Sequence, residues 1–412
     1  MKLRFLLPLL LAAGVPALAE EAEDITADCG ISAPTAAARL SRLSDRNYGT
    51  AYVSDKQRTP YIEVTAPKSS DLYGVYICFG GKLSPWQIEA KRGGKWVTVY
   101  ESGGLFAHEY APLPEGEKSI RIKAVPEKQL ALSVSELFLF GPGNAPAFVQ
   151  QWQPTPEKAD LMVIAAHPDD EVLFLGGAIP TYAGEKGMNV VVVYMTCGNM
   201  EDLIKNNKPC MRRSELLNGL WEMGVRTYPV INDFWDKYAK KLDKAYEAWG
   251  KSKTDQCIVR LFRQYKPEVV ITHDVDGEYG HGAHRVCADA AQRCVSIAAN
   301  PGKYADSANQ YGAWEVKKLY LHLYKGDAIE MDWDQPLSAF GGRTGYQVAE
   351  DAYAWHVSQH EAGQKNPETG KFETFIVEPR DSDYSCYRFG LAYTLVGPDE
   401  EKNDFFEHIP GY

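Results

Sequence analysis

The chain has 412 residues, with 44 basic and 55 acidic side chains and a formal net charge of −11 at pH 7. Hydrophobic residues make up 45% and charged residues 24%, which is ordinary for a globular protein and excludes dominant disorder, collagen and coiled coil. The acidic balance argues against a nucleic-acid partner, because phosphate binding needs clustered Lys and Arg. Single cores rarely grow past a few hundred residues, so the length predicts two or three domains.

Residues 1–19 have the pattern of a secretory signal peptide. Lys2 and Arg4 precede a short apolar run, and small residues, Ala17 and Ala19, stand before Glu20. This pattern predicts cleavage near Ala19 and a secreted or extracytoplasmic protein, in the periplasm or at the cell exterior. The alternative is a buried N-terminal helix. The run is too short for a bilayer and no later stretch is longer, so we expect no membrane span.

Eight cysteines follow the predicted cleavage site. An even count in an exported chain permits disulfides, and Cys197 with Cys210 and Cys29 with Cys78 are candidate pairs. The cysteines at 287 and 294 fall in one predicted helix, roughly 10 Å apart, which is too far for a bridge. The alternative is that the thiols are free and buried.

Short alternating runs predict an all-β domain, a sandwich or jelly-roll, over residues 29–143. The runs lie at 73–79, 86–90, 96–100, 119–124 and 133–140. Residues 144–157 contain several prolines and are predicted to form a linker.

Residues 158–412 have the pattern of an α/β domain. Apolar strands are predicted at 161–166, 189–196, 228–231, 268–272 and 316–324. Helices are predicted at 171–187, 212–223, 254–265, 285–299 and 345–362. Strands that alternate with helices indicate a mostly parallel, doubly wound sheet.

Two polar motifs follow predicted strands. AHPDDE, residues 166–171, comes directly after the first strand of the α/β part, and three of the chain's nine histidines lie within residues 273–284, after the fourth strand. The carboxyl ends of parallel strands meet at one edge of a sheet, where ligands bind. Histidines and carboxylates gathered there are natural ligands for a divalent metal such as zinc. Each motif alone is more often a turn or a surface helix pair, but the two together favour a metal site.

Three motifs of the chain resemble those of a known family. AHPDDE, RRSELLNGLWEMGV on the next helix and YGHGAH after a later strand are similar to the LmbE/PIG-L de-N-acetylase family. YGHGAH departs from the commoner GHPDH form of that family but keeps both histidines. The family implies a Rossmann-like catalytic domain and zinc-dependent removal of the N-acetyl group from an N-acetylglucosamine unit. The N-terminal segment resembles discoidin-like, galactose-binding-type domains, some of which bind carbohydrate.

The resemblance implies roles for particular residues. The zinc ligands would be His167, Asp170 and His284, with Zn²⁺ or another divalent transition metal bound. Asp169 would be the general base, His281 would stabilise charge or protonate the amine, and Tyr279 would contact the oxyanion. Arg212 and Asp233 would bind the sugar.

The sequence therefore predicts an exported zinc hydrolase acting on an N-acetylated amino-sugar glycan or glycoconjugate and releasing acetate. Two alternatives stay open. One is a metal-dependent hydrolase of a phosphoester or peptide bond. The other is a carbohydrate-binding protein with an inactive hydrolase domain.

Overall fold

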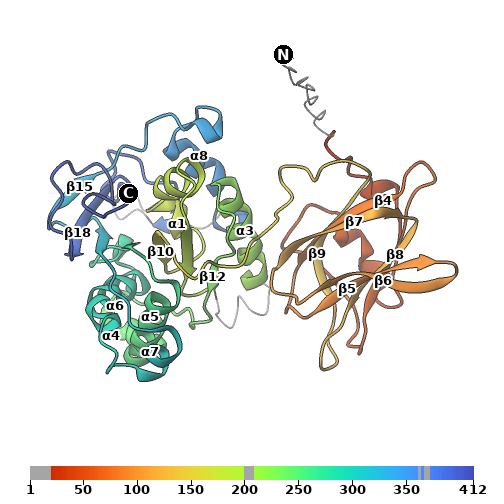
Figure 1. Ribbon diagram of the computed structural model, residues 1–412, viewed down its shortest axis with the longest axis horizontal. Helices are drawn as coiled ribbons and strands as arrows, with labels where there is room; N and C mark the ends of the chain where they lie inside the picture. Colours follow the sequence, from red (N-terminus) through yellow and green to blue (C-terminus); the bar gives the residue numbers. More distant parts are fainter. Residues whose placement is uncertain (1–19, 199–207, 361–362, 366–371) are drawn as a thin grey trace, which may run out of the picture.

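The protein is described by a computed structural model over residues 20–198, 208–360, 363–365 and 372–412. A β sandwich forms one body, and a larger α/β body lies beside it (Figure 1). The predicted signal peptide lies outside the described residues. No helix in the described ranges is both long enough and apolar enough to cross a membrane.

The sandwich consists of two antiparallel sheets. The five-stranded sheet has the order β1 (Gly30–Ser32), β3 (Tyr61–Thr65), β8 (Ser119–Ala124), β5 (Trp86–Arg92), β6 (Lys95–Ser102). The four-stranded sheet has the order β2 (Tyr52–Val53), β9 (Ser133–Phe140), β4 (Leu72–Phe79), β7 (His108–Glu117). Alternating apolar side chains such as Val75, Ile77 and Ile88 fill the space between the sheets. Short 3₁₀ turns, η1 (Thr26–Asp28) and η2 (Ala37–Leu43), pack on it.

A seven-stranded sheet forms the centre of the second body. Its order is β12 (Val230–Ile231), β11 (Val190–Tyr194), β10 (Leu161–Ala165), β13 (Val269–Thr272), β14 (Lys318–His322), β18 (Arg388–Thr394), β15 (Ala328–Glu330). The first five strands are parallel, as the alternating pattern predicts, while β18 runs antiparallel to both of its neighbours. The chain leaves β10 toward β11 and later returns to β13 on the other side, so a crevice opens at the carboxyl ends of β10 and β13.

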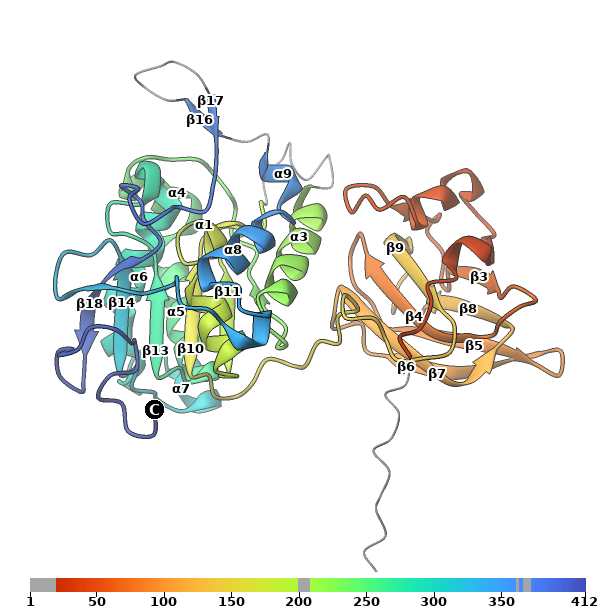
Figure 2. The same ribbon diagram turned by 90° about the horizontal axis from the view of Figure 1, so that it is seen from above.

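Helices cover both faces of this sheet (Figure 2). On one face, Leu161, Val163 and Ala165 pack against α1 (Asp170–Leu173), α3 (Lys208–Glu222) and α8 (Gly345–Tyr353). On the other, Met162 and Ile164 pack against α4 (Leu242–Trp249), α5 (Lys251–Tyr265) and α6 (Gly282–Ala298). Burial on both faces explains why the strand is apolar throughout. The smaller elements are α7 (Ala305–Tyr311), α9 (Val357–His360), η5 (Ser338–Phe340), β16 (Gly363–Lys365) and β17 (Phe372–Thr374).

Two predicted helices are interrupted. The helix expected over 171–187 is the single turn α1, followed by irregular chain and a π-helical turn, η3 (Pro180–Glu185). Gly177 packs so closely on the Trp333 ring that an added Cβ would lie 2.1 Å from its Cγ, and Pro180 lacks the N–H that a continuous α-helix needs. The helix expected over 345–362 divides into α8 and α9.

The two candidate disulfide pairs, Cys197 with Cys210 and Cys29 with Cys78, are not bonded. All eight cysteines lie within the described residues, and none is bonded to another. Five of them are buried, in agreement with the alternative of free thiols among apolar side chains.

The two bodies are joined along α3. Nη2 of Arg213 donates hydrogen bonds to the carbonyl oxygens of Phe79 (2.7 Å) and Gly81 (3.0 Å), at the end of β4. The backbone N–H of Ala107 donates to the Tyr228 hydroxyl at 3.1 Å. The sandwich therefore touches the helix that also carries Arg212.

Candidate metal and catalytic site

A cavity of about 580 Å³ opens at the carboxyl edge of the α/β sheet. Its size is within the range usual for small-molecule sites. All of the predicted site residues line it except Asp233: His167, Asp169, Asp170, Arg212, Tyr279, His281 and His284. The two motifs therefore meet in space although more than a hundred residues separate them.

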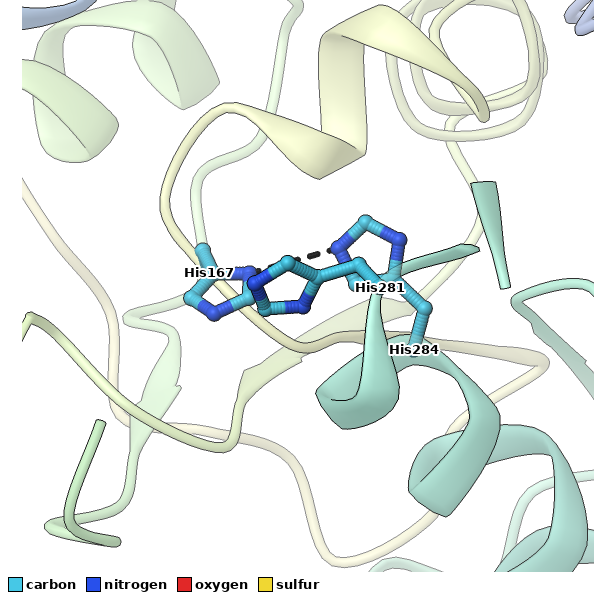
Figure 3. Close-up of side chains that lie close together, drawn as sticks. All are labelled: His167, His281 and His284. Carbon is cyan, nitrogen blue, oxygen red and sulfur yellow. Dashed lines mark hydrogen bonds between the residues drawn. The ribbon is translucent and has the colours of Figure 1, made fainter. Parts of the chain in front are cut away.

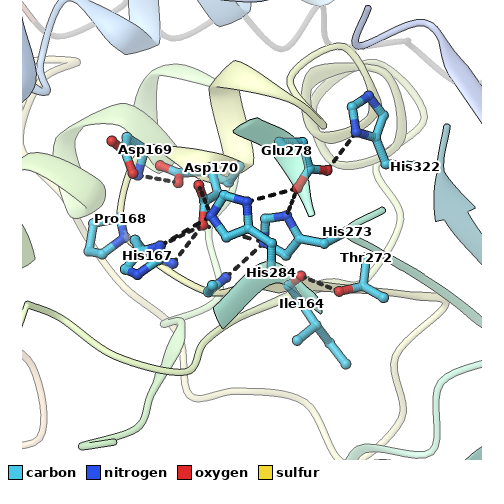
Figure 4. A network of polar contacts seen from close by, with 12 residues as sticks. Ile164, His167, Pro168, Asp169, Asp170, Thr272, His273, Glu278, His284 and His322 are labelled. Atoms are coloured by element: carbon cyan, nitrogen blue, oxygen red, sulfur yellow. Dashed lines mark hydrogen bonds and ion pairs between the residues drawn. The ribbon is translucent and has the colours of Figure 1, made fainter. Parts of the chain in front are cut away.

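Three of these side chains aim their ligand atoms at one point (Figures 3 and 4). Nδ1 of His167 lies 3.2 Å from Oδ2 of Asp170 and 3.3 Å from Nε2 of His284, and that Nε2 lies 3.2 Å from Oδ1 of Asp170. A tetrahedral ion with bonds of ~2.0 Å keeps its ligand atoms ~3.3 Å apart. Two imidazole nitrogens and one buried carboxylate at this spacing fit a divalent metal.

Asp169 is held in an unusual backbone conformation beside this triangle. Its φ is +122°, which a residue with a side chain adopts at a cost of about 1–3 kcal/mol. Its N–H donates to Oε2 of buried Glu171 at 2.8 Å, and Oδ1 accepts from Nη2 of Arg212 at 3.2 Å. These contacts turn the Asp169 carboxylate into the cavity and away from the three ligand atoms.

Burial sets the electrostatics of this carboxyl. Burial raises the pKa of Asp169 to about 7, and the Arg212 guanidinium limits the rise. Arg212 is itself buried, and it also donates to the carbonyl oxygen of Pro168. The guanidinium thus joins α3 to the loop after β10.

His281 lies at the wall of the cavity as the N-cap residue of α6. Its ring centroid is 4.8 Å from those of both His167 and His284, and its Nδ1 is buried without a hydrogen-bond partner. Burial and the neighbouring rings lower the pKa of His281 to about 2, so its imidazole is neutral at neutral pH. A neutral ring that lines the cavity can contact a substrate there.

Tyr279 lines the cavity but its hydroxyl is already engaged. It donates its one proton to the Glu378 carboxylate, and its ring lies 5.5 Å from that of Phe375. In this arrangement the proton is not directed at a substrate oxygen.

Asp233 does not line this cavity. It is exposed and lines a separate one with Lys253 and Arg260. Asp236, three residues further along the same loop, lines the candidate site, with Oδ1 3.5 Å from Nε2 of His167. Burial opposes ionisation, but His167 and Arg212 lower the pKa of Asp236 to about 2.

Several further residues surround the site. His273 is fully buried beside Asp170 and His284, and these three form a second group that could hold a metal. Glu278 lies behind the ligand histidines (Figure 4). Glu171 contacts His356, whose Nε2 is 2.9 Å from its Oε1. The polar residues DDE and GEYGH in the motifs were the available signal for Glu171 and Glu278.

The fold and the cavity together define an α/β protein with a histidine–carboxylate centre of the kind that binds a divalent metal. Residues 162–295 match the family described as PIG-L: GlcNAc-PI de-N-acetylase. The chain therefore carries a PIG-L (LmbE) family domain, as the motifs predict.

Relatives and solved structures are similar to parts of the chain. A 1D-myo-inositol 2-acetamido-2-deoxy-alpha-D-glucopyranoside deacetylase 1 from Frankia casuarinae is 26% identical over 194 residues, which are 42% of this chain and 62% of the relative. The chain thus spans about three fifths of that relative's length. The N,N'-diacetylchitobiose deacetylase from Pyrococcus horikoshii is 20% identical, with a TM-score of 0.36, over 50% of this chain and 72% of that one. An F5/8 type C domain from Bacteroides fragilis is 18% identical, with a TM-score of 0.25, over 31% of this chain and 98% of that one.

Proposed function

We propose that this chain is an exported, zinc-dependent hydrolase that removes the N-acetyl group from an N-acetylglucosamine-type amino sugar in a glycan or glycoconjugate. The observation that carries the proposal is the triangle of His167, Asp170 and His284 with a further carboxylate, Asp169, in the same cavity. The family match and the deacetylase names of the relatives support the choice of bond. The predicted signal peptide supports export.

Imidazole nitrogens and a carboxylate are usual ligands of zinc in proteins. His167, Asp170 and His284 would hold the metal, and another divalent transition metal could replace zinc. When bound, zinc supplies a Lewis acid that polarises a carbonyl and acidifies a water molecule.

The remaining side chains would carry the proton transfers. Arg212 and Glu171 hold Asp169 in its orientation. Asp169 takes a proton from the attacking water. Water adds to the acetamide carbonyl, the C–N bond breaks, and the proton on Asp169 passes to the leaving amine. The products are acetate and a free amino sugar.

Four other residues would contact the sugar or the developing charge. His281 lines the cavity and would stabilise the oxyanion. Asp236 lines the cavity where Asp233 was expected, and Arg212 lines it too. Tyr279 would assist only after its bond to Glu378 is exchanged.

Acetate release tests the proposal directly. The zinc-loaded chain is incubated with N-acetylated chito-oligosaccharides and mucin-type glycans, and acetate is assayed. We expect acetate from at least one of them, and none after His284→Ala. An active zinc-loaded chain that cleaved only phosphoesters or peptides would overturn the choice of bond.

A further inference from the structure

A buried carboxylate, Glu278, lies behind the candidate metal site. It begins the 3₁₀ turn η4 (Glu278–Gly280) between β13 and α6, its side chain is fully buried, and it does not line the cavity. A buried carboxylate is unfavourable unless hydrogen bonds compensate it. The groups that contact Glu278 therefore indicate its role in the protein.

Three imidazoles contact this one carboxylate (Figure 4). Nδ1 of His273 and Nδ1 of His284 each lie 2.8 Å from Oε2, and Nδ1 of His322 lies 2.6 Å from Oε1. The backbone N–H of Asp274 adds a hydrogen bond to Oε1 at 3.1 Å. The carboxylate thus ties the loop after β13 to the end of β14.

The partners on the far side of two rings determine where their protons lie. Nε2 of His273 accepts a hydrogen bond from the backbone N–H of Ala166 at 3.0 Å, so the proton of that ring is on Nδ1 and points at Glu278. Nε2 of His322 lies 3.0 Å from the carbonyl oxygen of Ser385, so both nitrogens of His322 face acceptors.

The same reasoning fixes His284. Oε2 of an ionised Glu278 lies 2.8 Å from Nδ1 of His284 and so favours a proton on that nitrogen, which leaves the lone pair of Nε2 toward Asp170 and His167. The lone pair of His273 is used by Ala166, so His273 is not available as a ligand. Two groups of side chains could hold a metal, His167–His281–His284 and Asp170–His273–His284, and the contact with Ala166 argues against the second.

We propose that Glu278 is a positioning residue for the metal, one that holds His284 in its Nδ1–H tautomer and keeps His273 out of the ligand set. The inference rests on the metal site of the proposed function. A carboxylate that accepts the second N–H of a ligand histidine orients the ring and raises its basicity, and losing such a partner costs about 10–100-fold in metal affinity.

The test compares Glu278→Gln with wild type and with Glu215→Gln as a matched control. Glu215 is also buried, but its oxygens accept from the N–H and hydroxyl of Ser358 rather than from a ligand histidine. Zinc affinity is measured by competition with a chelating dye, together with the melting temperature of each metal-free protein. We expect Glu278→Gln to bind zinc about 10–100-fold more weakly, and Glu215→Gln to match wild type.

Nitrogen-15 NMR of the histidine rings in metal-free wild type supplies a readout that needs no variant. We expect His284 to carry its proton on Nδ1. An Nε2–H tautomer, or zinc affinity unchanged by Glu278→Gln, would overturn the inference. A wild-type chain that binds no zinc would instead overturn the metal site itself, so the two failures are distinguishable.

Discussion

At the scale of single residues, the loop after β10 separates two neighbouring carboxylates into different tasks. Asp170 points at the two ligand histidines, while the positive φ of Asp169 turns its side chain toward Arg212. The family resemblance already implied different roles for these two carboxylates. The sequence could not supply the conformation of Asp169, which depends on Glu171 and, through it, on His356.

Asp169→Asn removes the proposed base but keeps the size of the side chain. We expect zinc to remain bound and kcat to fall about 10²–10⁴-fold, the usual contribution of a general base. Metal content and acetate release are measured on the same sample. Asp233→Asn is the matched control, because Asp233 lines a different cavity, and it should leave kcat near the wild-type value. Equal effects of the two substitutions would contradict the assignment of Asp169.

Glu136 gives a pH-dependent prediction away from the site. It is buried on β9, with Arg46 at 3.5 Å as a partner, and burial raises its pKa to about 7 from an ordinary value of 4.5. A folded-state pKa above the unfolded value favours the protonated form, so this group's stabilisation is complete below about pH 4.5 and is lost as the pH rises through 7. Glu136→Gln should therefore unfold at the same free energy as wild type at low pH and be more stable at pH 8, by up to about 3 kcal/mol. Urea unfolding at pH 4.5 and pH 8 measures this, and a difference independent of pH would contradict it.

At the scale of elements, the apolar runs predicted β10 to β14 and five strands of the sandwich, but not β15 and β18 or the sandwich strands β1, β2, β3 and β7. The helices α3 and α6 were also predicted, whereas the helix expected directly after β10 is broken. A single glycine or proline in a helical pattern is often tolerated, so such a residue does not by itself predict where a helix ends. The break at Gly177 depends on its contact with Trp333, which is 156 positions away in the chain. The antiparallel strand β18 is also determined by its partners, since nothing in its own sequence fixes its direction.

The position of His322 at the end of β14 could have been predicted from the sequence to lie near the site. His322 is the last residue of β14, and β14 is the parallel neighbour of β13, so its side chain lies at the same edge as the GHGAH motif. Glu378 and His356, in contrast, come from irregular chain after β17 and α8, and no local pattern indicates their contacts with Tyr279 and Glu171.

Helix α3 contacts the site and the sandwich with consecutive residues. Arg212 binds the loop after β10, and Arg213 donates to two carbonyl oxygens at the end of β4. Hydrogen bonds from charged groups contribute about 1.5–3 kcal/mol each. We expect Arg213→Ala to lower the free energy of unfolding by about 1–3 kcal/mol in denaturant titrations.

Arg226→Ala is the control for that substitution. Its Nη1 donates to the carbonyl oxygens of Trp221 and Val225, within the same segment, so its loss does not separate the two bodies. If Arg226→Ala were as destabilising as Arg213→Ala, the contact between sandwich and α3 would not be the cause.

At the scale of the whole molecule, two bodies share an interface that includes buried polar groups. Nδ1 of His108 lies 2.9 Å from Oε1 of Gln150, whose Nε2 donates to Oδ1 of Asn218 on α3 at 2.7 Å. This network links the sandwich, the proline-bearing segment and the α/β body. The sequence predicted that segment as a linker, but the composition alone could not reveal that part of it is packed between the two bodies.

Metal binding should also stabilise the whole molecule. A ligand that binds only the folded state adds about 2.7 kcal/mol when its concentration is a hundred times its Kd, which for a body of this size raises Tm by roughly 5–10 °C. Calorimetry of wild type with zinc and after chelation measures the shift. His284→Ala should show no shift, and an equal shift in that variant would place the metal elsewhere.

Metal content tests the central claim most directly. Elemental analysis of the purified protein, beside His284→Ala prepared in the same way, determines which divalent metal each retains. We predict about one zinc, or another divalent transition metal, per wild-type chain, bound as in a three-ligand catalytic site, and none in the variant. Wild-type protein that retained no metal after zinc loading, or a variant that retained as much, would contradict the account.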